Sequence, residues 1–183
     1  MEQRKYKTKQ EVLIRGQEAV GKTLGEIDKT GRIATGKGAI GTVVEESWFG
    51  YKPNSKPAPD FEEAGVELKV TPYRRTPRGI QAKERLVCDM LNYDEEYYKT
   101  FETSAFWVKC ACILLMSYEH RDGVPKVDFT IDKAVLFQFP DEDLEVIRND
   151  WKILMDKIKA GQAHLISEGD TCLLYTSPSP RDA

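Results

Sequence analysis

The segment Gly65–Thr71, which reads Gly-Val-Glu-Leu-Lys-Val-Thr, constrains the fold more than any other part of the chain. Its apolar and polar side chains alternate, which is typical of a β-strand with one buried face. On such a strand Glu67 and Lys69 share one face, and Leu68 points into the core from the other. This segment therefore predicts a strand that also places an acid and a base side by side.

Helical patterns lie on both sides of this strand. Residues 9–21 are loosely helical, and residues 38–49 have apolar side chains at helical spacing, with Gly50 as the expected stop. The clearest helix begins at Pro140-Asp141 and ends at Gly161. Its apolar stripe consists of Leu144, Ile147, Trp151, Leu154 and Ile158.

Three further segments have the apolar character of strands: Leu86–Leu91, Ala111–Tyr118 and Lys133–Phe139. Residues 51–59 contain three prolines and predict a loop. Helices first, then a run of strands, then a helix indicate an α/β or α+β fold with a mixed β-sheet.

Length and composition set the broad class. The chain has 183 residues, which suits one domain with a substantial core. Because no apolar run approaches the length of a membrane span and the start has no apolar signal region, we expect a cytoplasmic protein. The four cysteines lack the spacing of a zinc site, so we expect reduced and mostly buried thiols, and we assign no role to His120 or His164.

The net charge of −3 does not by itself indicate a nucleic-acid-binding protein, but basic residues are concentrated in one strip. Between residues 69 and 85 the only acid is Glu84, and the basic side chains are Lys69, Arg74, Arg75, Arg78, Lys83 and Arg85. This strip is either a solvated loop or a surface that contacts phosphates beside an acidic site.

Two glycine motifs match nucleotide-binding patterns without the required context. Gly16–Thr23 fits the phosphate-binding loop pattern G-x-x-x-x-G-K-T, but the segment before it is polar and the segment after it is interrupted by glycines. A nucleotide-binding protein that uses this segment is the alternative from another functional class. Gly36–Gly41 fits G-x-G-x-x-G, but Asp60 follows a proline-rich loop rather than a second strand. We expect these glycines to lead into a helix.

Asp60 and the strand residues together suggest a metal site. Asp60 ends the preceding loop and can turn its carboxylate toward Glu67. Two carboxylates and the carbonyl of Leu68 suit a hard cation such as Mg²⁺. Lys69 would lie beside the reacting phosphate and offset its developing charge. The alternative is a surface ion pair between Glu67 and Lys69 on a half-buried strand.

The wider sequence favours the metal site. Pro59-Asp60 followed by Glu67-Leu68-Lys69 resembles the PD-(D/E)xK nuclease signature, proline included. The chain also resembles the MutH family of DNA endonucleases from about Gly21 to Thr171. The segments that carry the resemblance are Gly38–Gly41, Val44-Glu45, Trp48–Gly50, Ser55–Pro57, Asp60-Phe61, Gly65–Lys69, Phe101–Ser104 with Lys109, Asp150-Trp151, Met155-Asp156 and Gly161-Gln162.

The resemblance implies an α/β, restriction-endonuclease-like fold with a central mixed β-sheet flanked by helices. It assigns metal binding to Asp60 and Glu67, with the Leu68 carbonyl, and catalysis to Lys69. It also implies that Lys109 is a second lysine near the scissile phosphate.

The same resemblance implies a further acid, carried by a helix, that completes the metal site. Glu45 matches this acid. Because this chain has one extra residue between Glu45 and Gly50, Glu46 remains open as the alternative, and helical geometry does not choose between the two.

Members of the family cut duplex DNA at GATC, 5′ to the guanine, and leave 5′-phosphates. The implied partner is therefore double-stranded DNA, the implied cofactor is Mg²⁺, and the expected DNA contacts are Arg74, Arg75, Arg78 and Lys83. The segment Val66–Tyr73 and the basic strip look more like the type II restriction members. A mismatch-repair nicking enzyme and a DNA-binding fragment without catalysis are the alternatives.

The last twelve residues of the chain do not resemble the rest of a folded domain. Residues 172–183, Cys-Leu-Leu-Tyr-Thr-Ser-Pro-Ser-Pro-Arg-Asp-Ala, resemble the translation of a sequencing-library adapter. We therefore expect residues 1–171 to be a catalytic domain that stops before its natural end. The sequence does not indicate an oligomeric state.

Overall fold

The computed structural model describes residues 5–36, 39–52, 57–88 and 91–174. The chain divides into two compact units, which are described separately below. The first comprises residues 1–88 and 109–138, and the second comprises residues 89–108 and 139–183.

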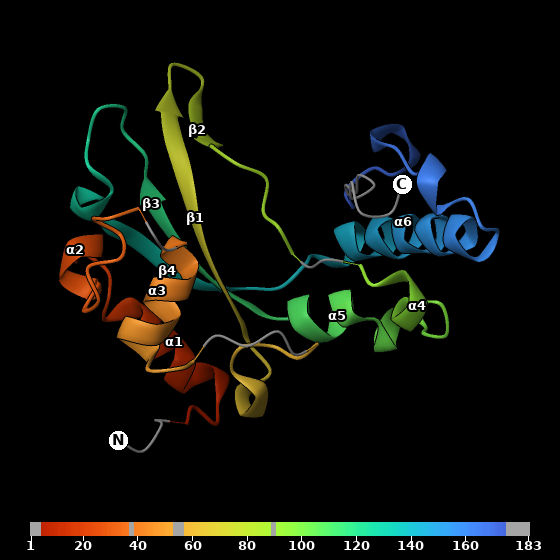
Figure 1. Cartoon of the computed structure of the whole chain (residues 1–183), viewed down its shortest axis with the longest axis horizontal. Helices are drawn as coiled ribbons and strands as arrows, with labels where there is room; N and C mark the ends of the chain where they lie inside the picture. Colours follow the sequence, from red (N-terminus) through yellow and green to blue (C-terminus); the bar gives the residue numbers. More distant parts are fainter. Residues whose placement is uncertain (1–4, 37–38, 53–56, 89–90, 175–183) are drawn as a thin grey trace. The chain divides into compact units, whose positions relative to one another are not determined.

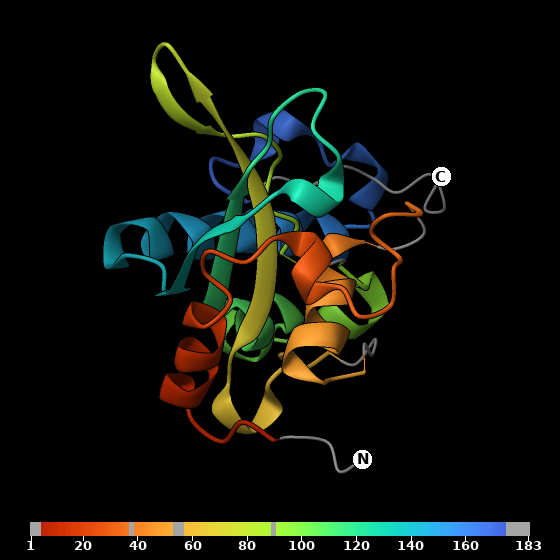
Figure 2. The same ribbon diagram turned by 90° about the vertical axis from the view of Figure 1, so that its left-hand side faces the viewer.

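The first unit is built on a four-stranded sheet with the order β2-β1-β3-β4 (Figure 1). The strands are β1 (Glu67–Thr76), β2 (Gly79–Ala82), β3 (Ile113–Glu119) and β4 (Ile131–Phe137). β1 is parallel to β3, whereas β2 and β4 are antiparallel to their neighbours. This arrangement confirms the mixed sheet and the strands expected in 65–71, 111–118 and 133–139, within a few residues at their ends. Figure 2 shows the β1–β2 hairpin projecting past the rest of the sheet.

The strand expected at Leu86–Leu91 is wrong in the described part of that segment. Residues 86–88 and 91 have no strand structure, and residues 89–90 lie outside the described residues. Val87 is 71% exposed, so the apolar pattern there does not mark a buried strand. The segment is held instead by side chains that donate to the carbonyl of Cys88.

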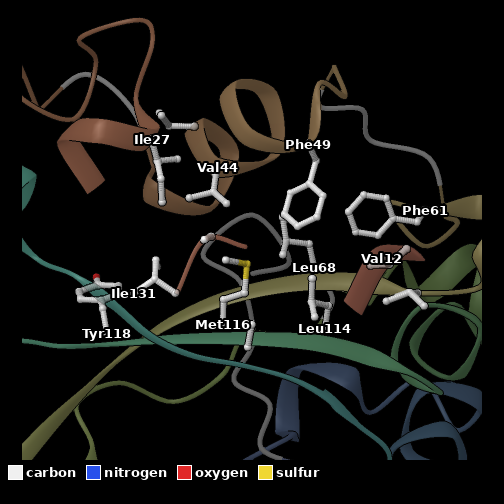
Figure 3. Close-up of a cluster of buried hydrophobic side chains, with 14 of the residues drawn as sticks. Val12, Ile27, Val44, Phe49, Phe61, Leu68, Leu114, Met116, Tyr118 and Ile131 are labelled. Carbon is white, nitrogen blue, oxygen red and sulfur yellow. The ribbon is translucent and has the colours of Figure 1, made fainter. Parts of the chain in front are cut away.

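Helical elements cover one face of the sheet and complete the core. They are α1 (Lys9–Gln17), α2 (Leu24–Ile27), α3 (Ile40–Val44) and the π-helical turn η1 (Glu45–Phe49). Figure 3 shows Leu68 and Leu114 reaching from β1 and β3 toward Phe49 and Phe61. Each fully buried side chain of this size contributes about 2 kcal/mol. Two single 3-10 turns, η2 (Glu62–Ala64) and η4 (Lys126–Asp128), connect these elements.

Gly16–Thr23 does not have the strand–loop–helix form of a phosphate-binding loop. Gly16 lies inside α1, where an added Cβ would be 3.0 Å from the Leu114 side chain, so the glycine permits a close helix–strand approach. Thr23 caps α2, a helix of only four residues. α3 begins at Ile40, as expected for glycines that lead into a helix, although residues 37–38 lie outside the described residues.

The second unit contains α4 (Tyr93–Glu96), η3 (Phe101–Thr103), α6 (Asp141–Lys159), η5 (Ala163–Leu165) and η6 (Glu168–Asp170), and α5 (Ala105–Cys110) runs from it into the first unit along the chain. α6 is the helix predicted from its apolar stripe, and Gly161 follows it at φ 72°. Asp150 on α6 is fully buried, and its carboxylate accepts hydrogen bonds from the backbone N–H groups of residues 172–174. The rest of the adapter-like tail, residues 175–183, lies outside the described residues.

The structure also describes the state of the cysteines and allows a search for membrane-spanning helices. All four cysteines are free, as expected, but only Cys110 and Cys112 are buried; Cys88 is half-buried and Cys172 is exposed, so the expectation that most are buried is not met. Among the described residues, no helix is long and apolar enough to cross a membrane.

Candidate active site

A short connection brings Asp60 against the start of β1. Phe61 and Val66 form an isolated antiparallel bridge, in which the Phe61 N–H donates to the Val66 carbonyl at 2.9 Å. Between them the chain turns through η2 and Gly65, whose φ of 63° favours glycine. The six residues between Asp60 and Glu67 are thus folded back on themselves, which explains why this spacing places the two acids together.

The backbone and side chains of these residues are joined by reciprocal hydrogen bonds. The Leu68 N–H donates to Asp60 Oδ2 at 2.9 Å, and the Asp60 N–H donates to Glu67 Oε2 at 3.2 Å. Lys69 Nζ lies 3.0 Å from Glu67 Oε1 and also donates to the Cys88 carbonyl at 3.0 Å. Glu67 is only 4% exposed, so the Glu67–Lys69 contact is not a surface ion pair.

The two candidate helix acids point to different partners. Glu46 forms an ion pair with Arg32. Glu45 is 8% exposed and lies close enough to Asp60 and Glu67 for their negative charges to raise its pKa. Glu45 opens the π-helical turn η1, which ends at Gly50 with φ 77°. A π turn closes one residue later than an α turn, so η1 accommodates the extra residue before Gly50.

Burial raises the pKa values of all three acids, and the negative charges of neighbouring acids raise those of Glu45 and Glu67 further. Burial raises the pKa of Glu45 to about 7, and the charges of Asp60 and Glu67 act in the same direction. Burial also raises the pKa values of Asp60 and Glu67, while the positive charges of Lys69 and Lys109 oppose that rise. Lys109, at the end of α5, therefore lies close enough to act on both carboxylates.

The donor set fits a hard divalent cation. The buried Glu45 and Glu67 and the half-buried Asp60 are close enough for the charges of the other two to act on Glu45, and Glu45 Oε1 is buried without a hydrogen-bond partner in the described structure. An uncompensated carboxylate oxygen is costly, and a cation would satisfy it. Among the described residues, however, no three acidic, His or Cys side chains converge tightly enough to coordinate an ion as they stand. Asp60 and Glu67 are instead engaged by the Leu68 N–H and by Lys69.

The basic strip forms the β1–β2 hairpin and the segment after it. Arg74 pairs with Asp122 at 3.5 Å, Arg75 with Glu119 at 3.5 Å, and Lys83 with Glu84 at 3.0 Å. Arg78 lies exposed in the turn, and the described residues give it no acidic partner. Residues 82–86 and the strands β1 and β3 line an open groove of about 420 Å³, formed by Thr71, Ala82, Lys83, Glu84, Arg85, Leu86 and Leu115. Because Thr71 is two residues from Lys69 and Leu115 pairs with Lys69 across the strands, the groove adjoins the acidic cluster.

The sequence prediction missed one participant, the backbone carbonyl of Cys88. This carbonyl accepts the second hydrogen bond of the Lys69 ammonium group and so fixes its direction. Cys88 lies 19 residues from Lys69 in the sequence. Because every residue has a backbone carbonyl, the sequence does not indicate which one accepts this hydrogen bond.

Comparisons with known proteins identify the family to which the chain is similar. Residues 49–150 match the family model described as DNA mismatch repair enzyme MutH. That range contains Asp60, Glu67, Lys69 and Lys109 but not Glu45. The chain is 40% identical over 181 residues to the type II restriction enzyme Sau3AI of Staphylococcus aureus, covering 97% of this chain and 36% of that protein. It is 29% identical over 182 residues to the DNA mismatch repair protein MutH of Escherichia coli O139:H28, covering 96% of this chain and 78% of that protein.

Proposed function

The chain belongs to the MutH family, and on that basis we propose that it is a divalent-metal-dependent endonuclease that hydrolyses phosphodiester bonds in double-stranded DNA. The observation that carries the proposal is the grouping of two buried acids, Glu45 and Glu67, with the half-buried Asp60 and with Lys69 fixed against Glu67. The chain spans only 36% of the Sau3AI enzyme, so the activity of that whole protein is carried over here as a proposal.

Each residue of the cluster has a role in this proposal. Asp60, Glu67 and Glu45 would hold Mg²⁺, together with the Leu68 carbonyl, and the ion would supply Lewis-acid polarisation of the scissile phosphate. Lys69 is directed by Glu67 and the Cys88 carbonyl, so its ammonium group is preorganised to stabilise negative charge that develops on the phosphate. Lys109 adds a second positive charge to the same region.

We propose GATC as the target, with cleavage of both strands as in type II restriction. The target follows from the family resemblance, and the higher identity to a restriction enzyme (40%) than to MutH (29%) favours this mode. A mismatch-repair nicking enzyme is the second candidate, and a DNA-binding fragment without catalysis is the third.

Labelled duplexes test the target directly. A duplex with one GATC site and a control duplex with GTAC at the same position are incubated with the protein and Mg²⁺, and both strands are resolved. We expect cuts before the guanine of GATC on both strands, with 5′-phosphate ends. Cutting of one strand only would favour the nicking enzyme, and equal cutting of both duplexes would contradict GATC recognition. Salt-dependent binding without any cut would favour the non-catalytic fragment.

Because only one of them is paired with an acid, we expect Arg75 and Arg78 of the hairpin to contribute unequally to DNA binding. Arg78→Ala is expected to weaken duplex binding and to reduce the dependence of log K on log salt by about one. Arg75→Ala is expected to have a smaller effect, because Arg75 already pairs with Glu119. Fluorescence anisotropy with EDTA, over a range of salt concentrations, measures both variants. Equal losses would show that the ion pair does not withhold Arg75 from phosphates.

A further inference from the structure

Glu45 depends on the position of a short and unusual helical turn. It is the first residue of η1, and its carbonyl accepts hydrogen bonds from the N–H groups of Gly50 and Tyr51. Single π turns that continue an α-helix, as η1 continues α3, are uncommon and are frequently found at functional sites. Because Glu45 Oε1 has no hydrogen-bond partner in the described structure, side-chain hydrogen bonds do not fix this oxygen, and the placement of η1 must do so.

Arg15 holds the far end of this turn. Its Nε and Nη2 atoms donate to the Trp48 carbonyl at 3.2 and 2.8 Å, and its guanidinium carbon lies 3.9 Å from the centroid of the Trp48 ring. The Trp48 indole N–H donates back to the Arg15 carbonyl at 2.8 Å. Glu18 accepts a further hydrogen bond from Arg15 Nη1 at 2.7 Å and orients the guanidinium. We name Arg15 and Trp48, with these contacts, the Arg15–Trp48 clamp.

The clamp connects η1 to the sheet that carries Glu67. Arg15 lies on α1, which packs against β3 and β4. The next residue, Gly16, allows α1 to lie so close to β3 that a Cβ would be 3.0 Å from Leu114. β3 in turn pairs with β1, where Glu67 faces Ile113. Contacts therefore run without a break from Glu67 through the sheet and α1 to the turn that carries Glu45.

We propose that Arg15 is a positioning residue that acts through Trp48 to keep Glu45 on the side of η1 that is close to Asp60 and Glu67, so that Glu45 can join them when a divalent metal binds. The inference rests on the proposed metal-dependent function. A planar guanidinium can donate twice to one carbonyl while it stacks on the indole ring, and the ammonium group of lysine cannot do both. Supporting residues of this kind typically change metal affinity 10- to 100-fold when they are replaced.

The test measures Mn²⁺ binding to the full chain without DNA, by the loss of the free-ion signal in electron paramagnetic resonance. Four proteins form a double-mutant cycle: wild type, Arg15→Lys, Glu45→Gln and the double variant. We expect Arg15→Lys to weaken Mn²⁺ binding about tenfold. In the Glu45→Gln background, the same Arg15→Lys change is expected to have no further effect, because the residue it positions is already altered.

Lys22→Ala is the matched control, because Lys22 Nζ also faces the Trp48 ring, at 5.8 Å, but donates no hydrogen bond to the Trp48 carbonyl in the described structure. It should leave Mn²⁺ affinity unchanged. Thermal unfolding of every variant shows whether each is folded at the temperature of the titration, and Arg15→Gln replaces Arg15→Lys if the latter is not.

Two results would overturn the inference in different ways. Equal weakening by Arg15→Lys in both backgrounds would mean that Arg15 supports the fold without acting through Glu45, while the proposed metal site stands. Unchanged affinity in Glu45→Gln would remove Glu45 from the metal site, and with it both the inference and that part of the proposed function.

Discussion

Asp60→Asn is expected to lower the rate of DNA cleavage roughly 10³-fold, because it removes one of the charges that hold the metal, whose contribution to catalysis is several kcal/mol. The fold should be retained. The amide oxygen of asparagine can still accept the hydrogen bond that the Leu68 N–H now donates to Asp60 Oδ2. Initial cleavage rates and circular dichroism spectra measured on the same preparations separate catalysis from folding.

Lys69→Ala, which removes the positively charged group of the site, is also expected to lower the rate of DNA cleavage. The loss of one preorganised donor at the developing charge is expected to lower the rate by about 10²–10³-fold. Lys152→Ala is the control, because Lys152 pairs with Asp156 on the exposed side of α6 and should not affect the rate. Undiminished cutting by either Asp60→Asn or Lys69→Ala would remove that residue from the mechanism.

Glu45→Gln is expected to stabilise the metal-free protein at alkaline pH. The pKa of Glu45 is raised from 4.5 to about 7 in the folded chain, so the folded state retains a proton that the unfolded state releases. The resulting stabilisation of the wild type is complete below pH 4.5 and is lost as the pH rises to about 7. A pKa rise of this size corresponds to about 3 kcal/mol in the free energy of unfolding. Glutamine has no proton to lose over this pH range, so the Glu45→Gln variant does not lose that stability.

Thermal unfolding with EDTA at pH 5 and pH 8 measures this effect. The Tm of Glu45→Gln should exceed that of the wild type by roughly 5–10 °C at pH 8 and by much less at pH 5. Glu46→Gln is the matched control. Because Glu46 forms an ion pair with Arg32, replacing it should not raise the Tm at pH 8. Added Mg²⁺ should raise the Tm of the wild type more than that of Glu45→Gln. A gain in Glu46→Gln instead would reverse the assignment of the helix acid.

The strand and its chemistry could be predicted because local patterns determine them. The alternation over residues 65–71 identifies β1, and the stripe from Leu144 to Ile158 identifies α6. The spacing of Asp60 and Glu67 predicts that they meet, and the turn through Gly65 brings them together. In each case side chains close in sequence carry the information.

The choice between Glu45 and Glu46 could not be made from the sequence, because neither acid lies on the apolar stripe of its helix. The π turn decides their directions, and it is held by Arg15, 33 residues from Trp48. The hairpin strand β2 was not predicted for a different reason: all four of its residues are exposed, so its sequence shows no alternation between a buried and an exposed face. The carbonyl of Cys88 and the ion pairs of Arg74 and Arg75 likewise depend on contacts that only the folded chain forms.

Cleavage of a supercoiled plasmid that contains GATC sites is the decisive test of metal-dependent endonuclease activity at the Asp60–Glu67 site. The wild-type chain is incubated with the plasmid in Mg²⁺, in EDTA, and beside the Asp60→Asn variant, and the ends of any product are mapped. We expect cuts that require Mg²⁺, lie at GATC, carry 5′-phosphates and disappear in Asp60→Asn. A folded wild-type chain that leaves the plasmid intact with Mg²⁺ and also with Mn²⁺, or that cuts it equally well after Asp60→Asn, would contradict this expectation.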